Sequence, residues 1–132
     1  MFEELRADAE TVTAWKKLAA DVAEALEAAG FTISPDSDEE EPAGPEIVVD
    51  HSGDGTGGVF VKWKTSPLLS MSVAKHVMAG ELRAAPVLQY GVISTEMHRS
   101  LLAIINAAGF IAIDASDDMD PFAIRVEKAG GL

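Results

Sequence analysis

The clearest pattern in the chain is helical and lies at its start. Between residues 4 and 29, apolar positions recur at gaps of three, four or seven, which places them on one stripe of a helix: Leu5, Val12, Trp15, Leu18, Val22, Leu26 and Ala29. Charged residues such as Lys17 and Glu24 fall on the other side. Gly30 follows directly, and glycine readily takes the left-handed conformation that ends a helix. We therefore predict an amphipathic helix over residues 4–29.

Alternation of residue types predicts two strands in the middle of the chain, over residues 46–50 and 59–64. Every second residue in these segments is apolar and suits a core-facing position: Ile47, Val49, Val59, Val61 and Trp63. The connecting residues 51–58 contain four glycines. Two alternating segments joined by a glycine-rich connection are typical of an antiparallel hairpin.

The stretch between the first helix and this hairpin combines strand and loop signals. Residues 31–34 are a short strand candidate. Residues 35–45 hold three prolines and a run of acidic residues, which disfavour both helix and strand. We expect residues 35–45 to form a mobile acidic loop.

A second helix is predicted over residues 66–80. Ser66 is a good capping residue, and Pro67 suits the first helical position. Gly80 ends the helix, whose apolar positions have a spacing of four: Leu69, Val73 and Val77.

The next segment, residues 81–93, is ambiguous. Pro86 interrupts it, and the apolar residues 87–93 fit either a buried strand or a packed loop. A final helix is predicted from residue 94 or 95 to residue 108. Two strands are predicted after it: residues 110–114 and 122–127.

These elements define one α+β domain over residues 1–132, with the order α-β-β-β-α-(β)-α-β-β and two or three helices packed on one antiparallel sheet. The sequence Ala-Ala-Gly-Phe occurs at residues 28–31 and again at 107–110, each time after an amphipathic helix. Duplication of a helix–strand–strand unit and simple convergence both explain this repeat.

Composition narrows the class of partner. The chain has 22 acidic and 10 basic residues and a formal net charge of −12, which disfavours nucleic acid and anionic membranes because both are negative. There is no cysteine, which excludes disulfides and thiolate chemistry and suits a reducing compartment. Neither an 18-residue apolar run nor a signal-peptide pattern occurs. We expect a soluble cytoplasmic protein, and its alanine content suggests a GC-rich bacterial genome.

The negative charge is unevenly distributed. Residues 36–46 hold six acidic residues and no basic one, whereas residues 59–104 hold five basic and two acidic residues. Lys62 and Lys64 project from the same predicted strand face as Phe60. Such a face suits an acidic protein or an anionic ligand, although two solvated lysines are the simpler interpretation.

The hairpin connection resembles the opening of a calcium-binding loop, because oxygen-bearing side chains alternate between Asp50 and Asp54. The match fails further on. Position eight is Gly57, where a branched apolar residue belongs, and position twelve is Val61, where a bidentate glutamate belongs. The three histidines lack metal-ligand spacing, so we expect no metal and no cofactor.

No nucleophile motif or catalytic constellation stands out, which disfavours an enzyme. We therefore expect a non-enzymatic protein-interaction domain of the adaptor, escort chaperone or inhibitor type. Homodimerisation through a sheet edge or the central helix remains open. The alternative is a small-ligand or metal-binding domain that uses the hairpin at 50–58. The residues that carry these two interpretations are Phe60, Lys62, Lys64, His51, Asp50 and Asp54.

Overall fold

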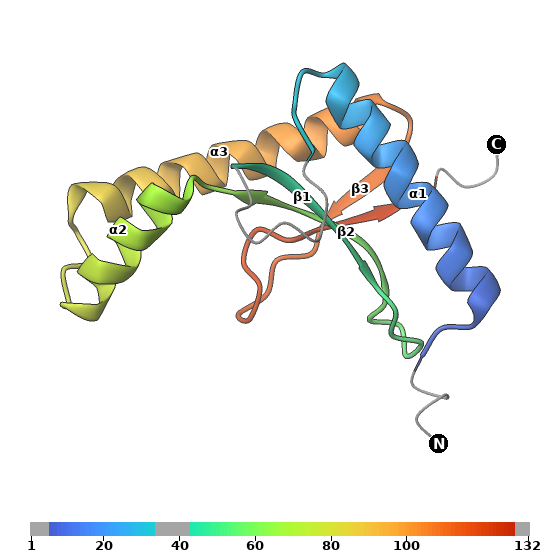
Figure 1. The fold of residues 1–132 in the computed structure, drawn as a ribbon, viewed down its shortest axis with the longest axis horizontal. Coiled ribbons are helices and arrows are strands. Elements are labelled where there is room, and N and C mark those ends of the chain that lie inside the picture. Colours follow the sequence, from blue (N-terminus) through green and yellow to red (C-terminus); the bar gives the residue numbers. More distant parts are fainter. Residues whose placement is uncertain (1–5, 34–42, 129–132) are drawn as a thin grey trace.

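Three helices and four strands make up the part of the chain that the computed structural model describes, residues 6–33 and 43–128 (Figure 1). In chain order they are α1 (Ala9–Ala28), β1 (Gly44–Asp50), β2 (Gly58–Lys64), α2 (Pro67–Met78), α3 (Ala85–Ala107), β3 (Ile111–Asp114) and β4 (Ile124–Glu127). The predicted α+β class, with helices on one antiparallel sheet, is confirmed.

The sheet has the order β1-β2-β4-β3, and all its neighbouring strands are antiparallel. The predicted β1–β2 hairpin is confirmed, since Asp50 pairs with Gly58 at its closed end and Gly44 with Lys64 at its open end. β4 lies between β2 and β3 and therefore joins the two hairpins into one sheet.

One face of this sheet carries the core. Val61 lies beside Ile47 on β1 and beside Ile124 on β4, so the three side chains share a face. Helices α1 and α3 both pack on that face. The buried apolar cluster consists of Val22, Leu26, Val59, Val61, Leu101, Ile105, Ile124 and Val126. The apolar side chains of the predicted helical stripe thus pack against the apolar side chains that alternate along the strands, as expected.

Helix α1 begins at Ala9, so residues 6–8 of the predicted helix are not helical, and its first two residues, Glu4 and Leu5, lie outside the described residues. Asp8 is the cap, and its Oδ1 accepts a hydrogen bond of 2.7 Å from the backbone N–H of Thr11. The backbone N–H of Ala7 donates to the carbonyl of His51 at 2.8 Å. The residues just before the cap therefore run along the β1–β2 connection and cannot extend the helix.

The strand expected at residues 31–34 is absent over residues 31–33, and Ser34 lies outside the described residues. The backbone N–H of Phe31 donates to the carbonyl of Leu26, so it closes the end of α1 and does not pair in a sheet. The ring of Phe31 meets Trp63 edge-on, with 5.9 Å between centroids. Packing, not strand pairing, holds this segment.

The acidic loop expected at residues 35–45 falls mostly outside the described residues, which resume at residue 43. Its last two residues belong to β1. Pro45 is tolerated there because β1 is an edge strand of the described sheet, where a missing N–H costs no ladder bond. The repeated Ala-Ala-Gly-Phe segments therefore differ, since only the second continues directly into a strand.

Residues 81–93 are neither strand nor loop over most of their length, which corrects the ambiguous prediction. Helix α3 begins at Ala85 and continues without a break to Ala107, so it starts well before residue 94. Pro86 lies in its first turn, where backbone N–H groups have no partner inside the helix. Proline there opens the helix and does not interrupt it.

Helix α2 and the first part of α3 form a helical hairpin that extends past one end of the sheet (Figure 1). We call residues 67–93 the helical arm. α2 contains no buried residue, whereas the buried residues of α3 are Ser94, Leu101 and Ile105. The later part of α3 therefore anchors the helix on the sheet, and the earlier part carries the arm.

Leu101→Ala should lower the free energy of unfolding by about 2–5 kcal/mol, because Leu101 is fully buried between α3 and the sheet. The matched control is Met119→Ala, whose side chain is 93% exposed and should change stability by less than about 0.5 kcal/mol. Urea denaturation followed by circular dichroism measures both. Equal destabilisation by the two variants would contradict the described core.

Candidate functional site

The face of the sheet opposite the core is not covered by any helix of the described chain, and we call it the open face. A row of four side chains crosses it from β1 to β3: Val48, Phe60, Arg125 and Ile113. The guanidinium of Arg125 lies over the ring of Phe60, 5.6 Å from its centroid. Val48 and Ile113, at the two ends of the row, are partly exposed.

Lys62 and Lys64 share the open face with Phe60, as the alternation predicts. Each of them faces a carboxylate. The Nζ of Lys62 lies 2.7 Å from Asp120, and the Nζ of Lys64 lies 3.3 Å from Glu46. The two lysines therefore stand in a charge-balanced setting and do not form a basic patch.

The hairpin residues singled out from sequence are spread apart. Asp50 borders a cavity of about 330 Å³ together with Phe60 and Lys62. His51 and Asp54 lie outside that cavity, in the connection between β1 and β2. The Asp54 carboxylate accepts hydrogen bonds from the backbone and side chain of Thr56, which lower its pKa.

The glycines of this connection allow close packing. A Cβ on Gly53 would stand 2.6 Å from the carbonyl oxygen of Arg6, and one on Gly57 would collide with the carbonyl oxygen of Ser52 and with Trp15. Over residues 6–33 and 43–128, no three His, Asp or Glu side chains gather closely enough to hold a metal ion. Gly53 and Gly57 are thus explained by the chain segment and the indole that pack against them.

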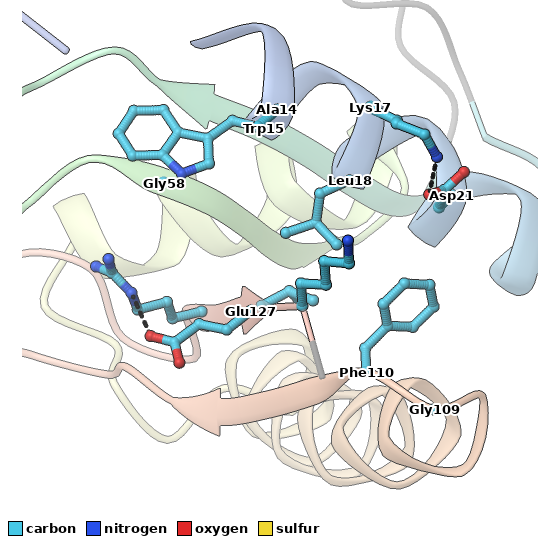
Figure 2. A pocket seen from close by; sticks show the side chains of 12 residues that line it. Ala14, Trp15, Lys17, Leu18, Asp21, Gly58, Gly109, Phe110 and Glu127 are labelled. Atoms are coloured by element: carbon cyan, nitrogen blue, oxygen red, sulfur yellow. Dashed lines mark hydrogen bonds and ion pairs between the residues drawn. The ribbon is translucent and has the colours of Figure 1, made fainter. Parts of the chain in front are cut away.

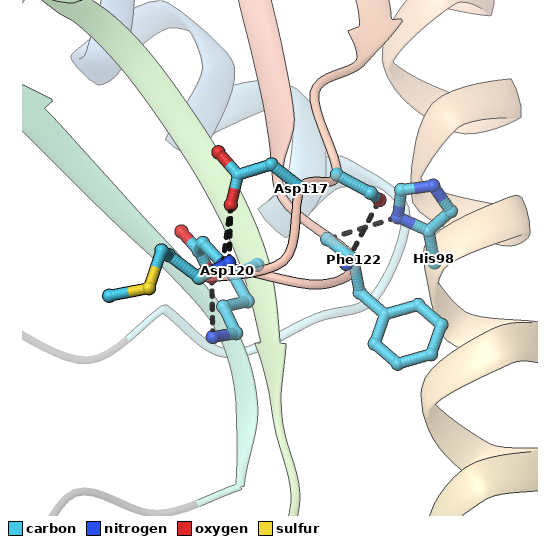
Figure 3. Close-up of polar contacts among 7 residues, drawn as sticks. His98, Asp117, Asp120 and Phe122 are labelled. Carbon is cyan, nitrogen blue, oxygen red and sulfur yellow. Dashed lines mark hydrogen bonds and ion pairs between the residues drawn. The ribbon is translucent and has the colours of Figure 1, made fainter.

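The connection between β3 and β4 is held by polar contacts that the sequence patterns did not reveal (Figure 3). His98 of α3 is 13% exposed at its side chain, and its Nδ1 lies 3.0 Å from the carbonyl oxygen of Phe122. Its Nε2 lies 3.4 Å from Oδ1 of Asp114. The rings of His98 and Phe122 also meet edge-on. His98 therefore joins α3 to both ends of this connection.

Phe122 has a φ of 69°, which is rare for a residue with a side chain. Its backbone N–H donates to Oγ of Ser116 at 2.9 Å. On the other side, Asp117 accepts hydrogen bonds from the backbone N–H groups of Met119 and Asp120. The contacts of His98 and Ser116 hold Phe122 in its strained conformation, and Asp120 in turn reaches Lys62 on the open face.

The hydroxyl and backbone N–H of Ser116 hydrogen-bond to the Asp114 carboxylate and hold its pKa below the ordinary value. Desolvation raises the pKa and offsets part of the effect of Ser116, and the nearby His98 adds smaller lowering contributions. The charged form of Asp114 is thus favoured in the folded protein. Its contribution to stability is present at neutral pH and is lost as the pH falls through the folded pKa.

A groove of about 640 Å³ lies between α1 and the strands (Figure 2). Trp15 and Leu18 border it from α1, and Phe110 borders it from the segment before β3. Two ion pairs stand at its rim, Lys17 with Asp21 and Arg125 with Glu127. The groove therefore has apolar walls and a charged rim. Gly58, at the end of the predicted hairpin segment, also lines it.

The helical arm is the most apolar exposed part of the described chain. Seven large apolar side chains there are between 46% and 88% exposed: Leu68, Met71, Val77, Met78, Leu82, Leu88 and Val92. The sequence patterns do not reveal this surface. Four of the seven side chains lie in the predicted helix over 66–80, whose pattern does not show that this side is left uncovered, and the other three lie in the ambiguous segment 81–93. For the latter, the gap of four between Leu88 and Val92, which continues into the final helix, is the available signal.

In the part of the chain that the structure describes, no helix is both long and apolar enough to cross a membrane. Comparisons with protein-family models, with curated proteins and with solved structures found no match. The function therefore has to be inferred from the chemistry of these surfaces.

Ser116→Ala should raise the pKa of Asp114 toward its ordinary value of 3.8, because the variant removes the largest of the contacts that favour the carboxylate. Thr56→Ala is the matched control, and it should raise the pKa of Asp54 while leaving that of Asp114 unchanged. NMR titration of the side-chain carboxyl carbons measures both. An unchanged pKa of Asp114 in the Ser116 variant would refute this account of the β3–β4 connection.

Proposed function

We propose that this protein is a non-enzymatic protein-interaction domain of the adaptor, escort chaperone or inhibitor type, and that the helical arm is its binding surface. The observation that carries the proposal is the set of seven exposed apolar side chains within residues 67–93. Soluble monomers rarely expose large contiguous apolar areas, and such areas typically mark interaction sites.

Burial of the exposed side chains of the arm by a partner would be favourable in free energy. Burying an exposed Leu, Met or Val side chain contributes about 1.5–3 kcal/mol. α2 buries none of its residues within its own chain, so its outward side chains contribute little to folding. A partner that covers only a few of them gains enough free energy to offset much of the cost of association.

The open face supports the proposal less well. Its lysines face carboxylates, and its central aromatic residue, Phe60, already lies beneath a guanidinium. A partner there would have to replace interactions that the chain makes with itself. On the arm it would displace only water, so the arm is the better binding surface.

The charge and composition of the chain add to the proposal. A net charge of −12 repels nucleic acid, so we propose a protein partner. A cysteine-free, alanine-rich chain suits a bacterial cytoplasm, which we propose as its setting.

A second candidate function is the binding of a small amphipathic ligand in the groove between α1 and β4. The groove volume of about 640 Å³ falls within the range of small-molecule sites, roughly 300–1,000 Å³. The apolar walls suit an aliphatic or aromatic body, and Lys128 near the rim suits a carboxylate. This site replaces the glycine-rich hairpin tip as the more suitable place for a ligand.

The arm proposal predicts that Leu68→Ser with Met71→Ser abolishes the capture of protein partners, because a hydroxymethyl group removes most of the apolar area. Affinity capture from the native source with quantitative mass spectrometry measures the effect. Partners of the wild-type chain, including copies of the chain itself, should be depleted at least about tenfold. The control is Met119→Ser, which changes an even more exposed methionine outside the arm and should retain every partner. Capture that the arm variant leaves intact would overturn the proposal.

The groove proposal predicts that decanoate raises the thermal unfolding midpoint in a concentration-dependent way. Ala14→Trp should suppress this rise, because Ala14 lines the groove and an indole there would fill it. Ala20→Trp on the same helix is the control, since Ala20 is exposed and does not line the groove. Differential scanning fluorimetry that finds no rise, or the same rise in both variants, would exclude this site.

A further inference from the structure

The outward side of the helical arm is apolar on both of its helices. Leu68, Met71 and Met78 of α2 are separated by gaps of three and seven, so they share one stripe. Leu88 and Val92 are four residues apart and share a stripe on α3. The residues on the inner side of the arm face the rest of their own chain.

Leu69 and Ile93 lie with Trp63 around a small cavity where the arm meets the sheet. The outer stripes have no such neighbours within the described chain, and their members remain exposed. The arm therefore has an inner side that packs on its own chain and an outer side that does not.

A hairpin of two helices forms only one seam of contact and cannot enclose a core. Four helices can, and two helical hairpins packed against each other form such a bundle. The exposed apolar side chains of one arm would form the centre of such an interface, and the polar residues beside them would form its rim. A second arm of the same kind is thus a partner of matching size and shape.

Charge favours the arm as the place where two copies meet. The arm contains two basic residues, Lys75 and Arg83, and one acidic residue, Glu81, in a chain whose net charge is −12. Glu81 lies 3.1 Å from His76 of the same arm. Contact between two copies through the outward side of α1 would bring several acidic groups together, whereas each arm carries only one acidic residue.

Lys75 lies in the same stripe as Met71 and Met78. Its long aliphatic stem can lie along apolar surface while its ammonium group stays in water at the rim. Its position does not prevent the burial of the methionines beside it.

We propose that the helical arm is a homodimerisation surface, on which the arm of a second copy of this chain packs to form a four-helix bundle. This inference rests on the proposed function and names the partner of the same surface. The interface is isologous, so each copy contributes the same residues.

The first test is sedimentation equilibrium of the purified chain over a range of concentrations. The wild type should be dimeric, and Met71→Glu with Met78→Glu should weaken the dimer by about 100-fold or more, because desolvating charged groups in the interface is costly even where Lys75 of the same stripe can pair with them. Met119→Glu is the control, since it places the same charge on an exposed methionine of the β3–β4 connection. It should leave the dimer intact. Circular dichroism verifies that each variant is folded.

A second test uses the absence of cysteine from the chain. Met71→Cys introduces a single thiol on the arm, and a bis-maleimide long enough to cross the bundle should link two copies through it. Met119→Cys is the matched control and should link far less. A wild type that is monomeric, a dimer that the arm variants leave unchanged, or equal linking through both cysteines would overturn the inference.

These tests also separate the inference from the proposed function. A monomeric chain that still captures another protein through its arm would overturn the homodimer and support the proposed function. A monomeric chain whose captured proteins do not depend on the arm would overturn both.

Discussion

The packing of one half of α3 on the sheet is the constraint on which the rest of the structure depends. Leu101 and Ile105 join α1, β2 and β4 in one buried cluster, and α3 is a single uninterrupted helix. The packing of α3 on the sheet completes the core and, because the helix is continuous, also sets the direction of the arm. Because the arm has no core of its own and a cavity lies beside Trp63 where the arm meets the sheet, its position relative to the sheet depends mainly on the rigidity of α3.

His98 stands where the buried part of α3 meets the connection between β3 and β4. It binds that connection to the helix through Phe122 and Asp114, and Asp120 continues the polar contacts to Lys62 on the open face. Polar groups thus hold the side of the sheet that no helix of the described chain covers. The arm is the opposite case, since its outer surface has few polar contacts and many apolar side chains.

Periodicity was sufficient to predict the elements that face the core. The stripe from Val12 to Leu26 and the alternation in β1, β2 and β4 were correct because burial on one side imposes a regular pattern. Two predictions were wrong because one residue type is compatible with two kinds of local structure. Pro86 opens a helix as readily as it breaks one, and Phe31 packs on Trp63 without pairing in a strand. The candidate sites were harder to predict, because the partners of Lys62 and His98 are distant in sequence or on another element.

The length of α2 has an electrostatic consequence. A helix of 12 residues measures about 18 Å, so the tip of the arm lies roughly that far beyond the end of β2. The Debye length at physiological ionic strength is about 8 Å, so more than two such lengths separate the tip from the end of β2. A molecule bound at the tip is therefore largely screened from the charged side chains of the described sheet, and it senses them strongly only in dilute buffer.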